Sequence, residues 1–194
     1  MNTSKESSIK DRLKNIARET GKDYNFLCIQ YLQERFLARL SRSNFRENFI
    51  LKGALLLLVY RIPMARPSKD IDFLGSQTSN APGDIREIIQ AIAEIELEDG
   101  VTFIPEDMHV ETIAADAEYG GIRAKISATV GGDRYRLLLD IGFGDTIVEG
   151  PLDMNYPTLL DTEPPTIKVY SLESSLAEKW EAIVRFGMFV RVRT

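Results

Sequence analysis

The sequence predicts an α+β fold: a mixed, largely antiparallel sheet with flanking helices, preceded by two N-terminal helices. Three observations predict it. Apolar residues recur every three or four positions near the start of the chain, which is typical of amphipathic helices. Short apolar segments beside glycine and proline then have the pattern of strands and turns. Finally, glycine pairs separate three extended segments in the middle of the chain, as in a meander of hairpins.

Two amphipathic helices are predicted first. The pattern covers Ser7 to about Thr20 and about Tyr24 to Leu40, and Gly21 marks the break between them. Cys28 is expected to be a small packed side chain, because no second cysteine or nearby histidine would activate it. This part is expected to act as a scaffold or a cap. One apolar stripe follows the second helix through Ile29, Leu32, Phe36 and Leu40.

A glycine turn then joins a strand to a helix. Phe49 to Leu51 are expected to form a short buried strand, and Gly53 permits the turn into a tightly packed helix from Ala54 to Tyr60. A second strand is predicted from Asp70 to Leu74. The spacing of isoleucines after it predicts an amphipathic helix from Asp84 to about Ile95.

Three extended segments form the predicted meander: His109 to Ala117, Ile122 to Val130 and Arg134 to Phe143. In the second, apolar residues alternate with charged or hydroxyl residues, so one face of the sheet is expected to be dry and the other wet. His109 stands at the start of the first segment without an evident partner. We expect it to be a surface or strand-end residue.

The end of the chain is predicted to contain a loop, a strand and a helix. A loop rich in proline, aspartate and glycine follows Phe143, and Ile167 to Tyr170 are expected to form a short strand. A helix is predicted from Leu172, after the capping residue Ser171, to about Phe186. The last residues, Phe189 to Thr194, do not continue the helical pattern.

Length and composition favour one soluble domain. The 194 residues are expected to form a single unit, 1–194, with a helical part (7–47), an α/β core (48–170) and the start of a C-terminal helical part (171–194). No apolar segment approaches the roughly 20 residues of a membrane span, and the first residues do not resemble a signal peptide. We therefore expect a cytoplasmic protein.

Charge and ligand types limit the chemistry. With one cysteine and one histidine, a Cys/His zinc site is excluded, so any metal is expected to be bound by oxygen. Acidic residues outnumber basic ones, 29 to 24, which disfavours generic nucleic-acid binding. A local basic pocket remains compatible with this balance, and it could be formed by Lys52, Arg61, Arg66 and Lys69. The alternative is that these four residues belong to a solvated loop.

Two carboxylates one residue apart are the main chemical signal. On a strand, Asp70 and Asp72 point to the same side with Cα atoms roughly 6 to 7 Å apart, and they repel unless a cation lies between them. Mg²⁺ prefers such oxygen ligands together with substrate phosphates. A third carboxylate from a neighbouring strand is expected to complete the site. Asp140, at the end of an apolar strand, is the best candidate, and Asp145 is the second choice.

These motifs together resemble the AbiEii/AbiGii toxin family of nucleotidyltransferases. The similar segments are 49–57, 66–75, 34–41, 139–145 and 177–179, so the resemblance covers roughly residues 30 to 187. It implies a polymerase-β-like nucleotidyltransferase fold and the use of a nucleoside triphosphate (NTP) with Mg²⁺. It also implies the toxin role in a bacterial toxin–antitoxin or phage-defence system, with a cognate antitoxin encoded nearby.

The resemblance also implies residue roles. Gly53 matches the glycine motif that lies against the triphosphate, and Ala54 stands where many relatives of the wider fold have serine. Lys179 matches a later lysine motif that contacts the nucleotide phosphates. The predicted catalytic residues are Asp70, Asp72, Asp140 and Lys179, of which the three aspartates are the metal ligands. The predicted nucleotide-binding residues are Lys52, Gly53, Ala54, Arg66 and Lys69.

Two functional hypotheses follow. The first is an enzyme that transfers a nucleoside monophosphate (NMP) from an NTP to an acceptor hydroxyl, on a tRNA 3′ end or a protein. The second is a truncated, catalytically degenerate member that binds a nucleotide or a protein. It arises because the family continues into a further helical region with another catalytic aspartate, whereas this sequence ends at Thr194. Loss of that region is also expected to expose apolar surface on the 172–186 helix and to favour self-association.

Overall fold

Two helices precede the sheet. The computed structural model describes residues 3–62, 68–113, 120–145, 147 and 150–190, and it begins with helix α1 (Thr3–Thr20) and helix α2 (Tyr24–Leu40). Gly21, with φ of +70°, separates them. Asp23 caps α2, because its Oδ1 accepts a hydrogen bond of 2.8 Å from the backbone N–H of Phe26. The prediction for α2 is confirmed over its whole length.

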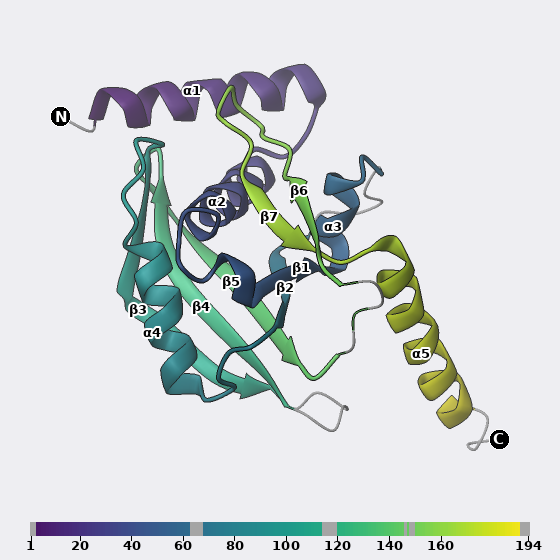
Figure 1. Cartoon of the computed structure of the whole chain (residues 1–194). Helices are drawn as coiled ribbons and strands as arrows, with labels where there is room; N and C mark the ends of the chain where they lie inside the picture. Colours follow the sequence, from purple (N-terminus) through teal and green to yellow (C-terminus); the bar gives the residue numbers. More distant parts are fainter. Residues whose placement is uncertain (1–2, 63–67, 114–119, 146, 148–149, 191–194) are drawn as a thin grey trace.

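A seven-stranded mixed sheet forms the centre of the described structure (Figure 1). The strand order is β3-β4-β5-β2-β1-β7-β6. Neighbouring strands are antiparallel except for the β1–β7 and β2–β5 pairs, so the predicted mixed, largely antiparallel sheet is confirmed. The strands are β1 (Phe49–Lys52), β2 (Asp70–Gly75), β3 (Val101–Ile113), β4 (Gly121–Val130), β5 (Asp133–Phe143), β6 (Leu152–Asn155) and β7 (Thr166–Val169).

Helices cover one face of this sheet. Helices α1 and α2 contact β4, and α2 also contacts β5, β7 and helix α4 (Pro82–Ala93), which packs on β3 (Figure 1). A 3-10 turn, Arg46–Asn48, precedes β1, and the short helix α3 (Gly53–Val59) follows β1 directly. Helix α5 (Leu172–Val190) leads away from the end of β7.

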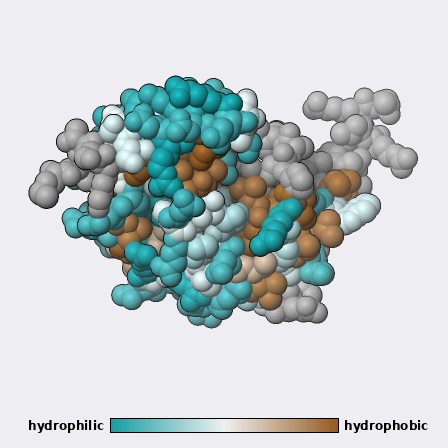
Figure 2. All heavy atoms as spheres, turned by 90° about the horizontal axis from the view of Figure 1, so that it is seen from above, coloured by the Kyte–Doolittle hydropathy of each residue, from teal (hydrophilic) through white to brown (hydrophobic). Residues whose placement is uncertain are grey.

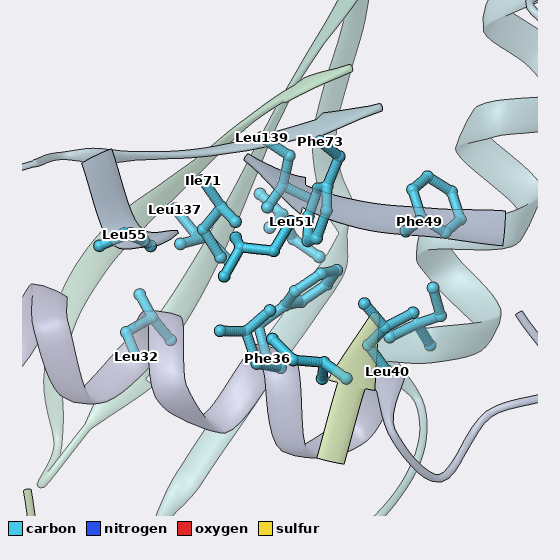
Figure 3. Packing of buried hydrophobic residues seen from close by; sticks show 14 of the residues in the cluster. Leu32, Phe36, Leu40, Phe49, Leu51, Leu55, Ile71, Phe73, Leu137 and Leu139 are labelled. Atoms are coloured by element: carbon cyan, nitrogen blue, oxygen red, sulfur yellow. The ribbon is translucent and has the colours of Figure 1, made fainter. Parts of the chain in front are cut away.

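The hydrophobic core lies between α2 and the sheet. Leu32, Phe36 and Leu40 of α2 point toward the strands (Figure 3). They meet side chains from four other elements, among them Leu51, Leu55, Ile71, Phe73, Leu137 and Leu139. Along β5 the buried residues alternate with partly exposed ones, so Leu138 and Asp140 point to the opposite face. The core therefore determines which face carries the polar side chains.

The structure corrects three element predictions. Strand β3 begins at Val101 rather than His109, and its pairing with β4 is irregular between Ile104 and His109. His109 is exposed, as expected, but it lies inside the strand. The expected loop after Phe143 contains strand β6, and α5 continues to Val190, so residues 189 and 190 are helical. The predicted strand residues 114–117 lie outside the described part.

Hydrophobic patches interrupt a largely hydrophilic surface in Figure 2. The most exposed large apolar side chains of the described residues are on α5, where Leu176, Trp180, Ile183 and Val184 are each more than half exposed. Their spacing of three or four residues places them along one stripe. Among the described helices, none is both long and apolar enough to cross a bilayer.

Candidate active site

A glycine turn brings α3 against the second strand. Gly53 has φ of +69°, a conformation that glycine adopts without the cost that other residues bear. A Cβ atom at this position would stand 2.0 Å from Oδ2 of Asp72. The absence of a side chain at residue 53 therefore leaves room for the Asp72 carboxylate beside the turn.

Three carboxylates converge next to this turn. Asp70 and Asp72 are on β2, and Asp140 is the direct neighbour of Asp72 on the parallel strand β5. One carboxylate oxygen from each residue lies within 4.8 Å of the other two. Asp140, the first choice for a third carboxylate, is thus in the same cluster. Asp145, the second choice, instead contacts Lys52.

The three charges repel one another. Two unit charges less than about 5 Å apart interact with roughly 3 kcal/mol at an effective dielectric constant of about 20. Burial, together with the neighbouring charges of Asp70 and Asp140, raises the pKa of Asp72 from 3.8 to about 6. A divalent cation would relieve this repulsion, and carboxylate oxygens are ligands that Mg²⁺ prefers. The donor set therefore fits such an ion.

Two hydrogen-bonding groups from outside the strand support Asp70. The hydroxyl of Ser68 donates to Oδ1 of Asp70 at 2.7 Å. Gln33, fully buried on α2, donates from Nε2 to the backbone oxygens of Ser68 at 3.2 Å and Asp70 at 3.3 Å. These contacts fix the start of β2 on α2. Neither Gln33 nor Ser68 was predictable as a site residue from the sequence, since no local pattern connects α2 with residue 70.

Lys52 stands on the glycine side of the carboxylates. Its Nζ donates to Asp145 and Glu178, both at 2.7 Å, and lies 5.8 Å from the centre of the Tyr170 ring. Burial lowers the pKa of Lys52, but the hydrogen bonds to Asp145 and Glu178 outweigh this effect, so its pKa is raised. Lys52 therefore connects β1 with the end of β5 and with α5.

Arg123 stands on the other side, on β4. Its Nε and Nη2 donate to the two carboxylate oxygens of Asp140 at 2.7 and 2.6 Å. The hydrogen bonds to Asp140 raise the pKa of Arg123. A glycine turn, three carboxylates and two flanking cations thus lie side by side across strands β1, β2, β5 and β4.

Comparison with known protein families gives this geometry a context. The model of the family described as "Nucleotidyl transferase AbiEii toxin, Type IV TA system" matches residues 35–193. The chain belongs to the AbiEii family. This match includes the glycine turn, all three carboxylates and the whole of α5. No curated protein matches the chain.

Two solved structures resemble this AbiEii-family chain. JHP933 from Helicobacter pylori is 17% identical, with a TM-score of 0.52 over 81% of this chain and 56% of that one. A second H. pylori protein, provisionally described as a nucleotidyltransferase, is 18% identical, with a TM-score of 0.48 over 81% of this chain and 59% of that one. The present chain spans less than two thirds of the length of either protein. The likeness to JHP933 shows a shared fold, and the mixed sheet and the family match agree with the predicted α+β nucleotidyltransferase fold.

The remaining predicted residues are placed differently. Lys69 is exposed just before β2, and Lys179 is exposed on α5, where its neighbour Glu178 makes the contact with Lys52. Ala54 lies in the first turn of α3, beside Gly53. Arg66 lies outside the described residues. For this AbiEii-family chain, the structure therefore brings together Gly53, the three aspartates and Lys52. Among the described residues, no hydrogen bond or ion pair joins these to the side chain of Lys69 or Lys179.

A cavity of about 670 Å³ lies at the other end of the sheet. It is lined by residues before β1 and at the start of β7, among them Arg46 and Thr166, and by the C-terminal half of α2. Arg46 precedes β1, whereas Lys52 ends it, so this cavity is separated from the carboxylates by the length of the strand. The candidate site is instead on the face of the sheet.

Proposed function

We propose that the protein transfers an NMP from an NTP to an acceptor hydroxyl, with release of pyrophosphate. The observation that carries this proposal is the convergence of Asp70, Asp72 and Asp140 within 4.8 Å beside the Gly53 turn. Membership of the AbiEii family supports it. The proposal includes the toxin role, with an antitoxin encoded nearby, and action in the cytoplasm in phage defence.

In this proposal the three aspartates hold Mg²⁺. When bound, Mg²⁺ polarises a phosphoryl oxygen and neutralises the charge that develops on the phosphates. Asp70, Asp72 and Asp140 would supply one oxygen each. The bound cation would neutralise the negative charges of Asp70 and Asp140 that raise the pKa of Asp72. Their convergence on two neighbouring strands orients the site before any ligand arrives.

The nucleotide phosphates are proposed to lie at the Gly53 turn. Gly53 and Ala54 would present backbone there, and Lys52 would supply positive charge. Since Lys52 is bound to Asp145 and Glu178, it would act on the phosphates only by sharing or exchanging these partners. Lys69, Arg66 and Lys179 are proposed as further phosphate contacts. Lys69 directly precedes Asp70 in the sequence, and Lys179 follows Glu178, which contacts Lys52.

The acceptor is proposed to be a tRNA 3′ end or a hydroxyl group of a protein. Purified protein incubated with Mg²⁺ and each labelled NTP should label one of these pools when total RNA and total protein are supplied. The variant Asp70→Asn/Asp72→Asn should lose the labelling and any inhibition of cell growth. Asp84→Asn, which removes an exposed carboxylate on α4, is the matched control and should behave like the unmodified protein.

The alternative function is a binding module without turnover. Mg²⁺-dependent NTP binding with no transfer to RNA or protein would favour this alternative. Equal labelling by the double aspartate variant would contradict the proposed role of the carboxylates altogether.

A further inference from the structure

A row of charged residues crosses five strands of the sheet. The strand register places one residue from each strand side by side, with the carboxylates in the middle and a cation on each side. From β1 to β3 the row consists of Lys52, Asp72, Asp140, Arg123 and Glu111. Neighbours in such a row are close enough for their side chains to interact.

Among the described residues, the hydrogen bonds of Arg123 to the carboxylate cluster both go to Asp140. Two of its nitrogens donate to the two oxygens of Asp140, which is the fork geometry that arginine forms with a carboxylate and lysine does not. A carboxylate has about four lone-pair positions, so two hydrogen bonds leave acceptor capacity on both oxygens. Arg123 therefore orients Asp140 without using up its ability to bind a cation.

Asp140 needs such a partner because of its position. It is the neighbour of Asp72, and the like charges of Asp72 and Asp70 favour rotation of its side chain away from them. Asp70 has the Ser68 hydroxyl to hold it, but this hydroxyl does not contact Asp140. The fork from Arg123 is the contact that opposes the rotation of Asp140.

We propose that Arg123 is a positioning residue for cation binding: its guanidinium holds the Asp140 carboxylate in the orientation at which it meets Asp70 and Asp72. This inference rests on the proposed function, since it takes the three carboxylates as the cation site. Arg123 acts through Asp140 and is not itself assigned a contact with the substrate.

Arg123→Lys tests the proposal, because it keeps the positive charge and removes the fork. Mn²⁺ alone is the probe, and its binding to the full chain is measured by calorimetry or by the electron paramagnetic resonance signal of free Mn²⁺. Loss of a group that orients a metal ligand typically weakens binding by roughly 10- to 100-fold, so we expect the dissociation constant to rise about tenfold. The thermal unfolding midpoint should change by only a few degrees, because the pair is partly exposed.

Lys125→Arg provides the matched control. Lys125 is the next residue of β4 on the same face, but it binds Glu111 at 2.6 Å rather than a carboxylate of the cluster. This variant should bind Mn²⁺ like the unmodified protein. Asp140→Asn should weaken binding at least as much as Arg123→Lys, and the double variant Arg123→Lys/Asp140→Asn should be no weaker than Asp140→Asn alone.

Three results would overturn the positioning role. They are unchanged Mn²⁺ affinity in Arg123→Lys while Asp140→Asn binds weakly, an equal loss in Lys125→Arg, or full additivity in the double variant. Absence of Mn²⁺ binding by the unmodified protein would instead overturn the proposed function, and the positioning role with it. The two failures are therefore distinguishable.

Discussion

Lys52 and Arg123 flank the same carboxylates, but different parts of the chain hold them. The Lys52 side chain is only 15% exposed and is bound by Asp145 and Glu178, which are outside the cluster. The Arg123 side chain is 35% exposed and is bound by Asp140, a member of the cluster. Lys52 therefore links the site to α5 and to the rest of the fold, whereas Arg123 acts on the site itself.

Charged residues beside the carboxylates therefore have two different roles. On the Lys52 side, the surrounding carboxylates neutralise the ammonium group and dock a helix. On the Arg123 side, the guanidinium group neutralises a carboxylate and orients it. Substitution of Lys52 should therefore change stability and the position of α5, and substitution of Arg123 should change cation affinity.

The largest effect is expected from Gly53→Ala, at the Lys52 side. The positive φ costs a residue with a side chain about 1 to 3 kcal/mol, and the new Cβ would collide with the Asp72 carboxylate. Since a misplacement of about 1 Å can reduce a rate by roughly 100-fold, nucleotide transfer should fall at least that much. Transfer assays and thermal unfolding measure the two effects.

Gly132→Ala is the matched control for this prediction. Gly132 has φ of +86°, but a Cβ atom there meets nothing within 4 Å. This variant should show the conformational cost alone and retain its activity. If both variants lost activity equally, the close approach of residue 53 to Asp72 would not be the cause.

Asp72, between the two cations, should make stability depend on pH. Its pKa is raised from 3.8 to about 6 in the folded protein, so between these values the folded state binds more protons than the unfolded state. The metal-free protein should therefore lose stability, on the order of 2 kcal/mol, as the pH rises from about 4 to above 6. Chemical denaturation in the presence of EDTA measures this loss.

Asp72→Asn should remove that pH dependence. The variant should be more stable than the unmodified protein at pH 8 without metal, and no more stable at pH 4. An unchanged pH profile would contradict the raised pKa of Asp72 and, with it, the combined effect of burial and of repulsion by Asp70 and Asp140.

Lys52→Met should reduce stability by a smaller amount. The substitution leaves Asp145 and Glu178 without their cation, and both are partly exposed, so we expect a loss of about 1 to 2 kcal/mol. For a chain of this length, the unfolding midpoint should fall by roughly 3 to 6 °C. Trp180, the single tryptophan, lies on α5 and should report looser docking through lower fluorescence anisotropy.

Lys125→Met is the control for Lys52→Met. Lys125 forms a pair with Glu111 near the surface, away from α5, so its loss should change the midpoint little and leave Trp180 unaffected. An equal change of Trp180 anisotropy in both variants would contradict the role of Lys52 in holding α5.

The smallest effect on stability is expected from Trp180→Gln. Because Trp180 is 65% exposed, its replacement should leave the unfolding midpoint almost unchanged. It should reduce self-association, which we propose for the exposed apolar stripe of α5. Light scattering over a range of concentrations measures this, and a strict monomer before substitution would contradict the proposed self-association.

The strongly periodic elements were predictable from the sequence. The apolar stripe of α2 and the alternation in β4 follow directly from the periods of a helix and a half-buried strand. The first half of β3 was missed because it contains Pro105 and two acidic residues after it, which interrupt the pattern of a strand. The short edge strand β6 was missed because its alternation, Leu-Asp-Met-Asn, covers only four residues and lies in a segment rich in proline, aspartate and glycine.

The site was predictable only where its residues are local in sequence. The Asp70–Asp72 pair and the Gly53 turn belong to short motifs, and Asp140 was found because it ends an apolar strand. Arg123 was missed because its approach to Asp140 depends on the register of β4 on β5, which no single segment reveals. Glu178 was missed for a related reason, since its contact with Lys52 spans 126 positions of the chain.

The most direct test of the central claim is calorimetric titration of NTP into the protein with and without Mg²⁺. The carboxylate cluster beside Gly53 predicts NTP binding that requires Mg²⁺ and is lost in Asp70→Asn/Asp72→Asn. The Asp84→Asn control should bind normally. NTP binding that is the same without Mg²⁺, or the same in the double aspartate variant, would contradict the claim that these carboxylates hold the cation for the phosphates.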